Sequence, residues 1–160
     1  MSIATIRAAK QDDISALFAL ILELAQYEHL EDAVTGNQEA LREHLFGDPP
    51  YIEALVAEMD QQIVGYAMFF TSYSTFLTQP GLYLEDLYVQ EHHRGRGIGK
   101  ALLKCVAKLV SERNYGRLEW SVLDWNESAI AFYETLGAIV LPDWRICRVT
   151  GTALITLASG

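Results

Sequence analysis

The stretch His93-Arg94-Gly95-Arg96-Gly97-Ile98-Gly99-Lys100 stands between an apolar strand pattern that ends at Val89 and an apolar helix pattern. Glycine adopts backbone angles that other residues avoid, so alternating glycines can turn several amide N–H groups towards one anion. The helix that follows adds the free amides and the positive dipole of its N-terminus. Arg94, Arg96 and Lys100 supply positive charge. The stretch therefore predicts a loop that binds phosphate groups.

Two common phosphate-binding motifs do not fit the spacing of this loop. In a nucleotide P-loop a glycine lies five residues before the Gly-Lys-Ser/Thr, but here Arg94 holds that position and Ala101 follows Lys100. The dinucleotide pattern G-x-G-x-x-G is broken because the three glycines are evenly spaced. From these residues alone, an ordinary glycine-rich turn between a strand and a helix stays open as an alternative.

Length and composition indicate one folded domain over residues 1–160, because 51% of the residues are hydrophobic and 21% are charged. Apolar runs are shorter than the roughly 18 residues that a membrane helix needs. Charged residues such as Arg7 and Asp12 stand where a signal peptide has its apolar core. We therefore expect a cytoplasmic protein without a membrane partner.

The net charge of −9 disfavours nucleic acid as a partner and is compatible with a small cationic ligand. The two cysteines and four histidines show none of the spacings typical of metal ligands. We predict no metal site.

Hydrophobic periodicity predicts a mixed α/β fold. The expected strands are 3–7, 51–58, 63–71, 82–89, 117–123, 144–149 and 152–158, the last two forming a hairpin that turns at Thr150-Gly151. The expected helices are one opened by residues 11–13, a second over 37–46, a third after the glycine loop and a fourth over 127–136. Residues 72–81 are expected to form a loop.

Two adjacent acids, Glu85 and Asp86, interrupt the apolar strand over 82–89. Such acids are costly when they are buried without partners, which makes them candidates for a functional role. Successive strand residues face opposite sides, so only one of the two can face a given pocket unless the strand bulges there.

Four segments together resemble the GNAT superfamily of N-acetyltransferases, in the branch of the spermidine/spermine (diamine) and thialysine N-acetyltransferases. They are Glu23–Glu28, Tyr83–Val89, Arg94–Gly99 and Trp125–Ala138, and they fall in the family's order. The resemblance implies a mixed central β-sheet with helices on both faces and a splayed pair of parallel strands. It also implies acetyl-CoA as co-substrate and a homodimer.

The resemblance further implies residue roles. The cofactor would contact Leu87, Tyr88, Val89, Arg94, Gly95, Arg96, Gly97, Ile98, Gly99, Lys100, Asn126, Ala129 and Tyr133. The substrate amine would contact Tyr27, Glu28, Glu85, Asp86, Glu119, Trp120, Ser121 and either or both of Asp143 and Trp144. The match to the family weakens at residues 119–121 and 141–143.

Acetyl transfer requires a free amine, a stabilised oxyanion and a proton for the departing thiolate. Glu85 is the candidate base, Tyr133 the candidate acid, and the amide of Leu87 the candidate oxyanion donor. The expected reaction is acetylation of a primary amine on a small polyamine, diamine or lysine-like molecule. Acetylation of a protein N-terminus or lysine is an alternative, and so is a non-catalytic acyl-CoA sensor.

Overall fold

The computed structural model describes residues 4–160, which form two compact units, one that ends at Ser121 and one from Val122 to Gly160. The first unit contains, in order, β1 (Thr5–Ala8), η1 (Gln11–Asp13), α1 (Ile14–Tyr27), η2 (Glu31–Ala33), α2 (Gln38–Phe46), β2 (Glu53–Met59), β3 (Gln62–Ser74), β4 (Gln79–Val89), η3 (Glu91–His93), α3 (Ile98–Glu112) and β5 (Leu118–Trp120). The second unit contains α4 (Glu127–Thr135) and α5 (Gly151–Ser159).

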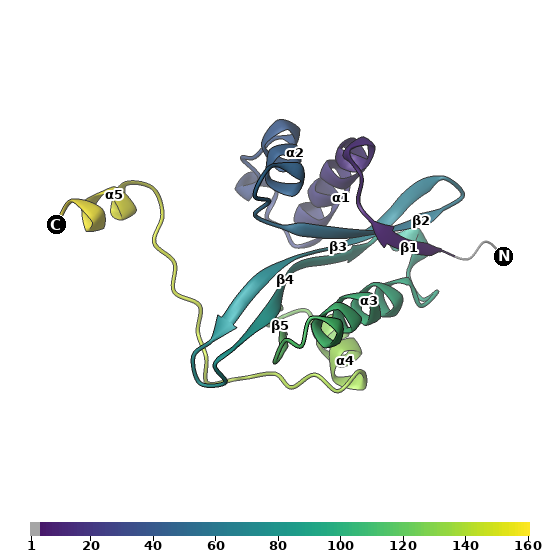
Figure 1. Ribbon diagram of the computed structural model, residues 1–160. Coiled ribbons are helices and arrows are strands. Elements are labelled where there is room, and N and C mark those ends of the chain that lie inside the picture. Colours follow the sequence, from purple (N-terminus) through teal and green to yellow (C-terminus); the bar gives the residue numbers. More distant parts are fainter. Residues whose placement is uncertain (1–3) are drawn as a thin grey trace. The chain divides into compact units, whose positions relative to one another are not determined.

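The sheet of the first unit has the order β1-β2-β3-β4-β5. The first four strands pair antiparallel, and β4 pairs with β5 in parallel. Helices α1 and α2 cover one face of this sheet and α3 covers the other (Figure 1). The predicted mixed sheet with helices on both faces is confirmed.

Strand β4 is irregular at the acid pair. Met68 on β3 lies opposite Asp86, but the next residue, Phe69, lies opposite Leu84, so Glu85 is the extra residue of a β-bulge. The parallel pairing with β5 covers only residues 82–84 of β4. Within the described residues, no strand continues this pairing along residues 85–89, which is the splayed arrangement expected from the sequence.

The core on the α1 and α2 face contains large side chains that are almost fully buried. It comprises Ile14, Leu17, Leu20, Leu45, Ala54, Val56, Tyr66, Met68 and Tyr88. Helix α1 supplies three of these residues, Ile14, Leu17 and Leu20. On the other face, α3 buries Ile98, Leu102, Leu103 and Val106. Burial on both faces fixes the position of β4 between the helices.

The prediction of a loop over residues 72–81 is wrong, because β3 continues to Ser74 and β4 begins at Gln79. Ser72 pairs with Gly81, and the last pair is Ser74 with Gln79, which leaves a turn of residues 75–78. The Ser74 hydroxyl accepts a hydrogen bond from the amide of Leu77 at 3.2 Å. Polar residues that satisfy the turn in this way gave the segment the composition of a loop.

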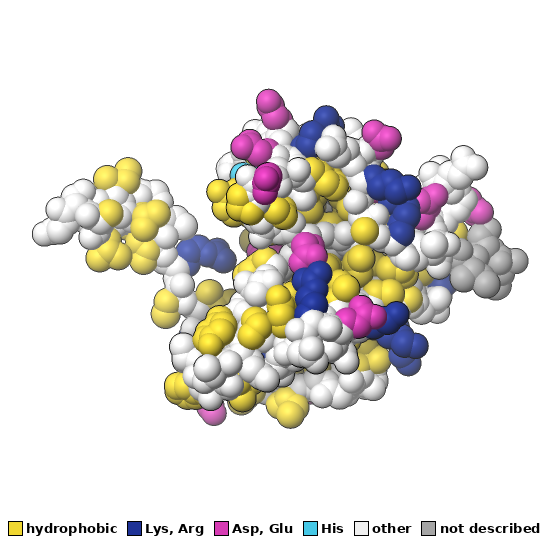
Figure 2. Space-filling model, viewed as in Figure 1, with side chains coloured by type: hydrophobic (Ala, Val, Ile, Leu, Met, Phe, Trp, Pro, Cys, Tyr) yellow, Lys and Arg dark blue, Asp and Glu magenta, His cyan; other side chains and the backbone are white. Residues whose placement is uncertain are grey.

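The second unit departs from the sequence prediction at its end. The predicted hairpin of 144–149 and 152–158 is wrong, since residues 144–149 form neither helix nor strand in the described chain and Gly151–Ser159 is helix α5. Alanine and leucine, which favour helices, recur among the β-branched residues of this segment. Hydrophobic side chains here are exposed (Figure 2), including Ile155 at 68% and Leu157 at 70%.

Helix α4 begins at the predicted residue, Glu127, and ends at Thr135, one residue before the predicted end. The side chain of Asn126 accepts a hydrogen bond from the amide of Ala129 at 3.3 Å, so Asn126 is the N-cap. The helix stops before Gly137, whose φ of +89° suits a glycine at the end of a helix.

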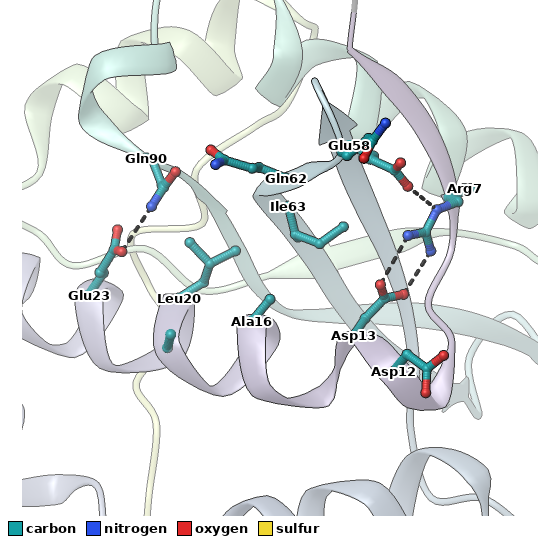
Figure 3. A pocket seen from close by; sticks show the side chains of 12 residues that line it. Arg7, Asp12, Asp13, Ala16, Leu20, Glu23, Glu58, Gln62, Ile63 and Gln90 are labelled. Carbon is teal, nitrogen blue, oxygen red and sulfur yellow. Dashed lines mark hydrogen bonds and ion pairs between the residues drawn. The ribbon is translucent and has the colours of Figure 1, made fainter.

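A charged cluster joins β1, α1 and β2 in the first unit. The guanidinium of Arg7 donates to both carboxylate oxygens of Asp13, at 2.7 and 3.0 Å, and to Glu58 at 2.6 Å. These residues line one side of a hollow of about 460 Å³ (Figure 3). The residues predicted to bind ligands are not among its lining residues. Because its charged groups bond to one another, we assign the cluster a structural role.

Asp13→Asn tests the contribution of this cluster to stability. Arg7 lowers the pKa of Asp13 below its usual 3.8, so the ionised form stabilises the fold above that pH. The substitution is expected to reduce the free energy of unfolding at pH 7 by about 2 kcal/mol. The difference should shrink as the pH falls below 3.8 towards the pKa of folded Asp13. Urea unfolding at pH 7 and at about pH 3 measures this difference in the free energy of unfolding. Asp12→Asn, which changes an exposed neighbour, is the control. An equal loss at both pH values would contradict the assignment.

Candidate functional site

The glycine loop joins the end of β4 to α3. Gly95 and Gly97 adopt φ of +73° and +79°, in the left-handed region that favours glycine. A Cβ atom on either would lie more than 4 Å from the described atoms beyond the adjoining residues, so space remains beside the backbone. Gly99 instead lies in the first turn of α3, which begins at Ile98. Two left-handed glycines before a helix N-terminus fit the predicted anion site.

Arg94 connects this loop to two other elements. Its Nε donates to the backbone carbonyl of Val89 at 2.8 Å. Its guanidinium carbon lies 4.6 Å from the ring centre of Tyr27 at the end of α1 and 5.4 Å from that of Tyr88 on β4. Cation–π contacts of this kind fix the side chain over the rings. Of the predicted site residues, Tyr27, Tyr88 and Arg94 are thus brought together.

An acidic cluster lies at the bulge of β4. The Oδ2 atom of Asp86 accepts a hydrogen bond from the hydroxyl of Tyr66 at 3.1 Å. Burial raises the pKa of Asp86 to about 6, and the neighbouring carboxylates of Glu85 and Glu28 add to this rise. Burial also raises the pKa of Glu28 at the end of α1. The structure therefore brings together three predicted substrate residues, and their charge favours a cationic ligand.

A second polar network lies next to this cluster. Glu23 on α1 accepts hydrogen bonds from the hydroxyl of Tyr88 at 3.2 Å and from the side-chain amide of Gln90 at 2.9 Å. Figure 3 shows the contact with Gln90. Burial raises the pKa of Tyr88, which keeps its hydroxyl protonated as a donor. Sequence analysis assigned no role to Glu23 or Tyr66, although a tyrosine among apolar strand residues indicates a partner for its hydroxyl.

The three predicted residues at the end of β5 already have partners or fixed positions. Glu119 forms an ion pair with the Nε of Arg117 at 2.7 Å. Ser121 shares a hydrogen bond of 2.7 Å with the hydroxyl of Tyr83. Trp120 lies opposite Leu84 in the register, next to the bulge. A ligand that uses Glu119 would therefore have to share it with Arg117.

The remaining predicted residues belong to the second unit. Ala129 and Tyr133 lie on α4, and Asn126 is the N-cap of this helix. The rings of Tyr133 and Phe132 are 5.3 Å apart. Asp143 and Trp144 lie in the segment before α5, where Trp144 is 78% exposed.

The described residues contain no group of three or more His, Cys, Asp or Glu side chains arranged to hold a metal ion. Among them, no helix combines the length and the apolar character that a membrane crossing requires.

The chain is similar to known acetyltransferases in sequence and in fold. Residues 15–138 match the model of the acetyltransferase (GNAT) family. The chain is 40% identical to the thialysine N-epsilon-acetyltransferase of Bos taurus over 99% of both chains. It is 32% identical, over 96% of its length and 23% of the relative's, to a human spermidine/spermine N(1)-acetyltransferase-like protein. An integron cassette protein of Vibrio cholerae has the same fold, with a TM-score of 0.81 and 24% identity over 98% of both chains.

Glu28→Gln tests the coupling inside the acidic cluster. Because the carboxylate of Glu28 helps to raise the pKa of Asp86, its neutralisation should lower that pKa below the value of about 6. Carbon-13 NMR titration of the aspartate carboxyl groups measures the change. Glu31→Gln, an exposed acid three residues later, is the control and should leave Asp86 unaffected. An unchanged titration in Glu28→Gln would show that the two carboxylates are not coupled.

Proposed function

Because the chain belongs to the acetyltransferase (GNAT) family, we propose that it transfers the acetyl group of acetyl-CoA to a primary amine of a small polyamine, diamine or lysine-like acceptor. The observation that carries this proposal is the position of two oppositely charged features on one strand. The acidic cluster lies at the bulge of β4, and the cationic glycine loop follows the end of the same strand. An anionic co-substrate and a cationic acceptor would thus meet along β4.

Acetyl-CoA supplies an activated thioester when it is bound. We assign its pyrophosphate to the loop that runs from Arg94 to Lys100, where the left-handed glycines and the N-terminus of α3 fit an anion. The part of β4 beyond its pairing with β5 fits an extended pantetheine arm, which we assign to residues 87–89. Asn126, Ala129 and Tyr133, in the second unit, are further proposed contacts, which we carry over from the family resemblance.

The acceptor amine must lose a proton before it can react, because an alkyl amine with a pKa of about 10 is protonated at neutral pH. We assign this step to Glu85, the bulge residue, whose exposed side chain can take the proton directly or through water. The amide of Leu87 would stabilise the oxyanion. Tyr133 would donate the proton that the departing thiolate requires.

We assign acceptor binding to the acidic cluster and to aromatic faces beside it. Asp86 and Glu28 would hold an ammonium group, with Tyr27 next to them. Glu119, Trp120 and Ser121 would line the far end of the acceptor site. Asp143 and Trp144, in the second unit, are further proposed contacts carried over from the family resemblance. The relatives are named for thialysine and for spermidine and spermine, which carry at least two amino groups. An acceptor of the same kind would place one amine at Glu85 and another at the remaining acids.

We also propose that residues 1–160 are one acetyltransferase domain and that it acts as a cytoplasmic homodimer. The family match over residues 15–138 supports the first point. The homodimer is carried over from the family resemblance of the sequence, and the cytoplasmic location from the composition of the chain.

Turnover of acetyl-CoA with thialysine, ornithine, spermidine, putrescine and a lysine peptide tests the proposed function. Free-thiol release and mass spectrometry of the products identify the acceptor. Glu85→Gln and Tyr133→Phe should each reduce kcat/KM by about 100-fold, as expected for loss of an acid or base. Glu39→Gln and Tyr51→Phe remove the same groups at exposed positions and serve as controls. Turnover of the peptide alone would favour protein acetylation, and binding without turnover would favour a sensor.

Gly97→Ala tests the proposed pyrophosphate site. A side chain in the left-handed region costs about 1–2 kcal/mol, so the loop should rearrange and the KM for acetyl-CoA should rise about tenfold. The KM for the amine should change little. Gly36→Ala is the matched control, because Gly36 also has open space around it but no left-handed φ. Equal KM values for acetyl-CoA in both variants would exclude the loop from the site.

A further inference from the structure

Tyr66 on β3 is a buried polar residue with a defined partner. Its exposed fraction is 0%, and it belongs to the core cluster between the sheet and α1 and α2. A buried tyrosine hydroxyl requires a hydrogen-bond partner. The structure provides one in Asp86, whose Oδ2 atom lies 3.1 Å from the hydroxyl. The ring is held by its packing, so the hydroxyl has a fixed position.

Asp86 needs such a partner because its surroundings oppose its charge. It is partly buried at the bulge, and the carboxylates of Glu85 on β4 and Glu28 at the end of α1 repel it. The hydrogen bond from Tyr66 acts in the opposite direction and favours the ionised form. Burial keeps the Tyr66 hydroxyl protonated, and the acids Asp86 and Glu28 reinforce this effect. Tyr66 is therefore a permanent donor to Asp86.

We propose that Tyr66 is a positioning residue for the amine acceptor, which holds the Asp86 carboxylate at the bulge of β4 in the ionised state that binds an ammonium group. This inference rests on the proposed function, in which Asp86 contacts the acceptor. Tyr66 itself does not touch the substrate in this arrangement. Its effect reaches the acceptor only through the orientation and charge of Asp86.

Because Asp86 has a pKa of about 6, the effect of Tyr66 should depend on pH and should be measurable in the KM for the acceptor. With a pKa of about 6, the carboxylate is mostly ionised at pH 7. Loss of the hydrogen bond from Tyr66 should raise that pKa by about one unit, since a hydrogen bond to a charged group has about that effect. The carboxylate would then be largely protonated at pH 6.5 and ionised again at pH 8.5. The acceptor remains cationic throughout this range.

Tyr66→Phe is the decisive variant because it removes the hydroxyl and keeps the ring. The experiment determines the KM for thialysine, the KM for acetyl-CoA and kcat from pH 6 to pH 9. We expect the KM for thialysine to rise about threefold at pH 6.5, as the ionised fraction of Asp86 falls, and to return close to the wild-type value at pH 8.5. The KM for acetyl-CoA should not change. Tyr73→Phe, an exposed tyrosine on the same strand, is the control.

Two further measurements separate this role from general destabilisation. In an Asp86→Asn background, which has no ionisable group at this position, Tyr66→Phe should have no further effect on the KM for thialysine. Carbon-13 NMR titration should show a higher pKa for Asp86 in Tyr66→Phe than in the wild type, with no substrate present. Thermal unfolding of each variant records any loss of stability.

A rise in the KM for thialysine that is the same at every pH would overturn the inference, because it would reflect a merely structural role. An unchanged Asp86 titration would overturn it as well, and this arm does not depend on activity. Failure of the proposed function is distinct, since the wild-type protein would then release no thiol from acetyl-CoA with any amine.

Discussion

The pairing of β4 is the constraint on which the rest of the structure depends. This strand is buried between helices, and its backbone groups must be hydrogen-bonded on both edges or stay unsatisfied at considerable cost. β3 pairs along its length on one edge, but on the other edge β5 pairs only with residues 82–84. The bulge at Glu85 begins where this pairing ends. The sheet therefore opens at the point where its two acids lie, and an extended ligand there would complete the strand pairing.

The surroundings of two carboxylates, Asp13 and Asp86, have opposite effects on their charge. Asp13 has its charge neutralised within the protein, because Arg7 binds both of its oxygens and lowers its pKa. At Asp86, burial and two further carboxylates raise the pKa to about 6, against the opposing effect of the hydrogen bond from Tyr66. The first arrangement stabilises the fold, whereas the second holds negative charge that a cation can neutralise. This contrast is the physical reason to assign the bulge, and not the charged hollow beside Arg7, to ligand binding.

The parts of this structure that depend on local patterns could be predicted from the amino-acid sequence. The helix opened by residues 11–13, the helix predicted over 127–136 and the glycine loop before α3 are encoded by neighbouring residues. The predicted hairpin at the end of the chain was wrong. β-Branched residues at 152–158 favour a strand, but a strand forms only where a partner strand is available, and this segment is a helix. The link between Tyr66 and Asp86 joins residues 20 positions apart, across a bulge that no local pattern reveals.

The rings of Tyr88 and Tyr66 connect Arg94 of the cationic loop to Asp86 of the acidic cluster. Its guanidinium lies over the ring of Tyr88, and that ring is 6.5 Å from the ring of Tyr66, which in turn bonds to Asp86. The two tyrosines lie on neighbouring strands opposite one another in the register. Packed rings of this kind have few alternative positions, so a displacement at one end is transmitted to the other. Because the two rings contact both charged groups, the spacing between the proposed anion site and the proposed cation site is set by the core of the sheet and not by the loops around it.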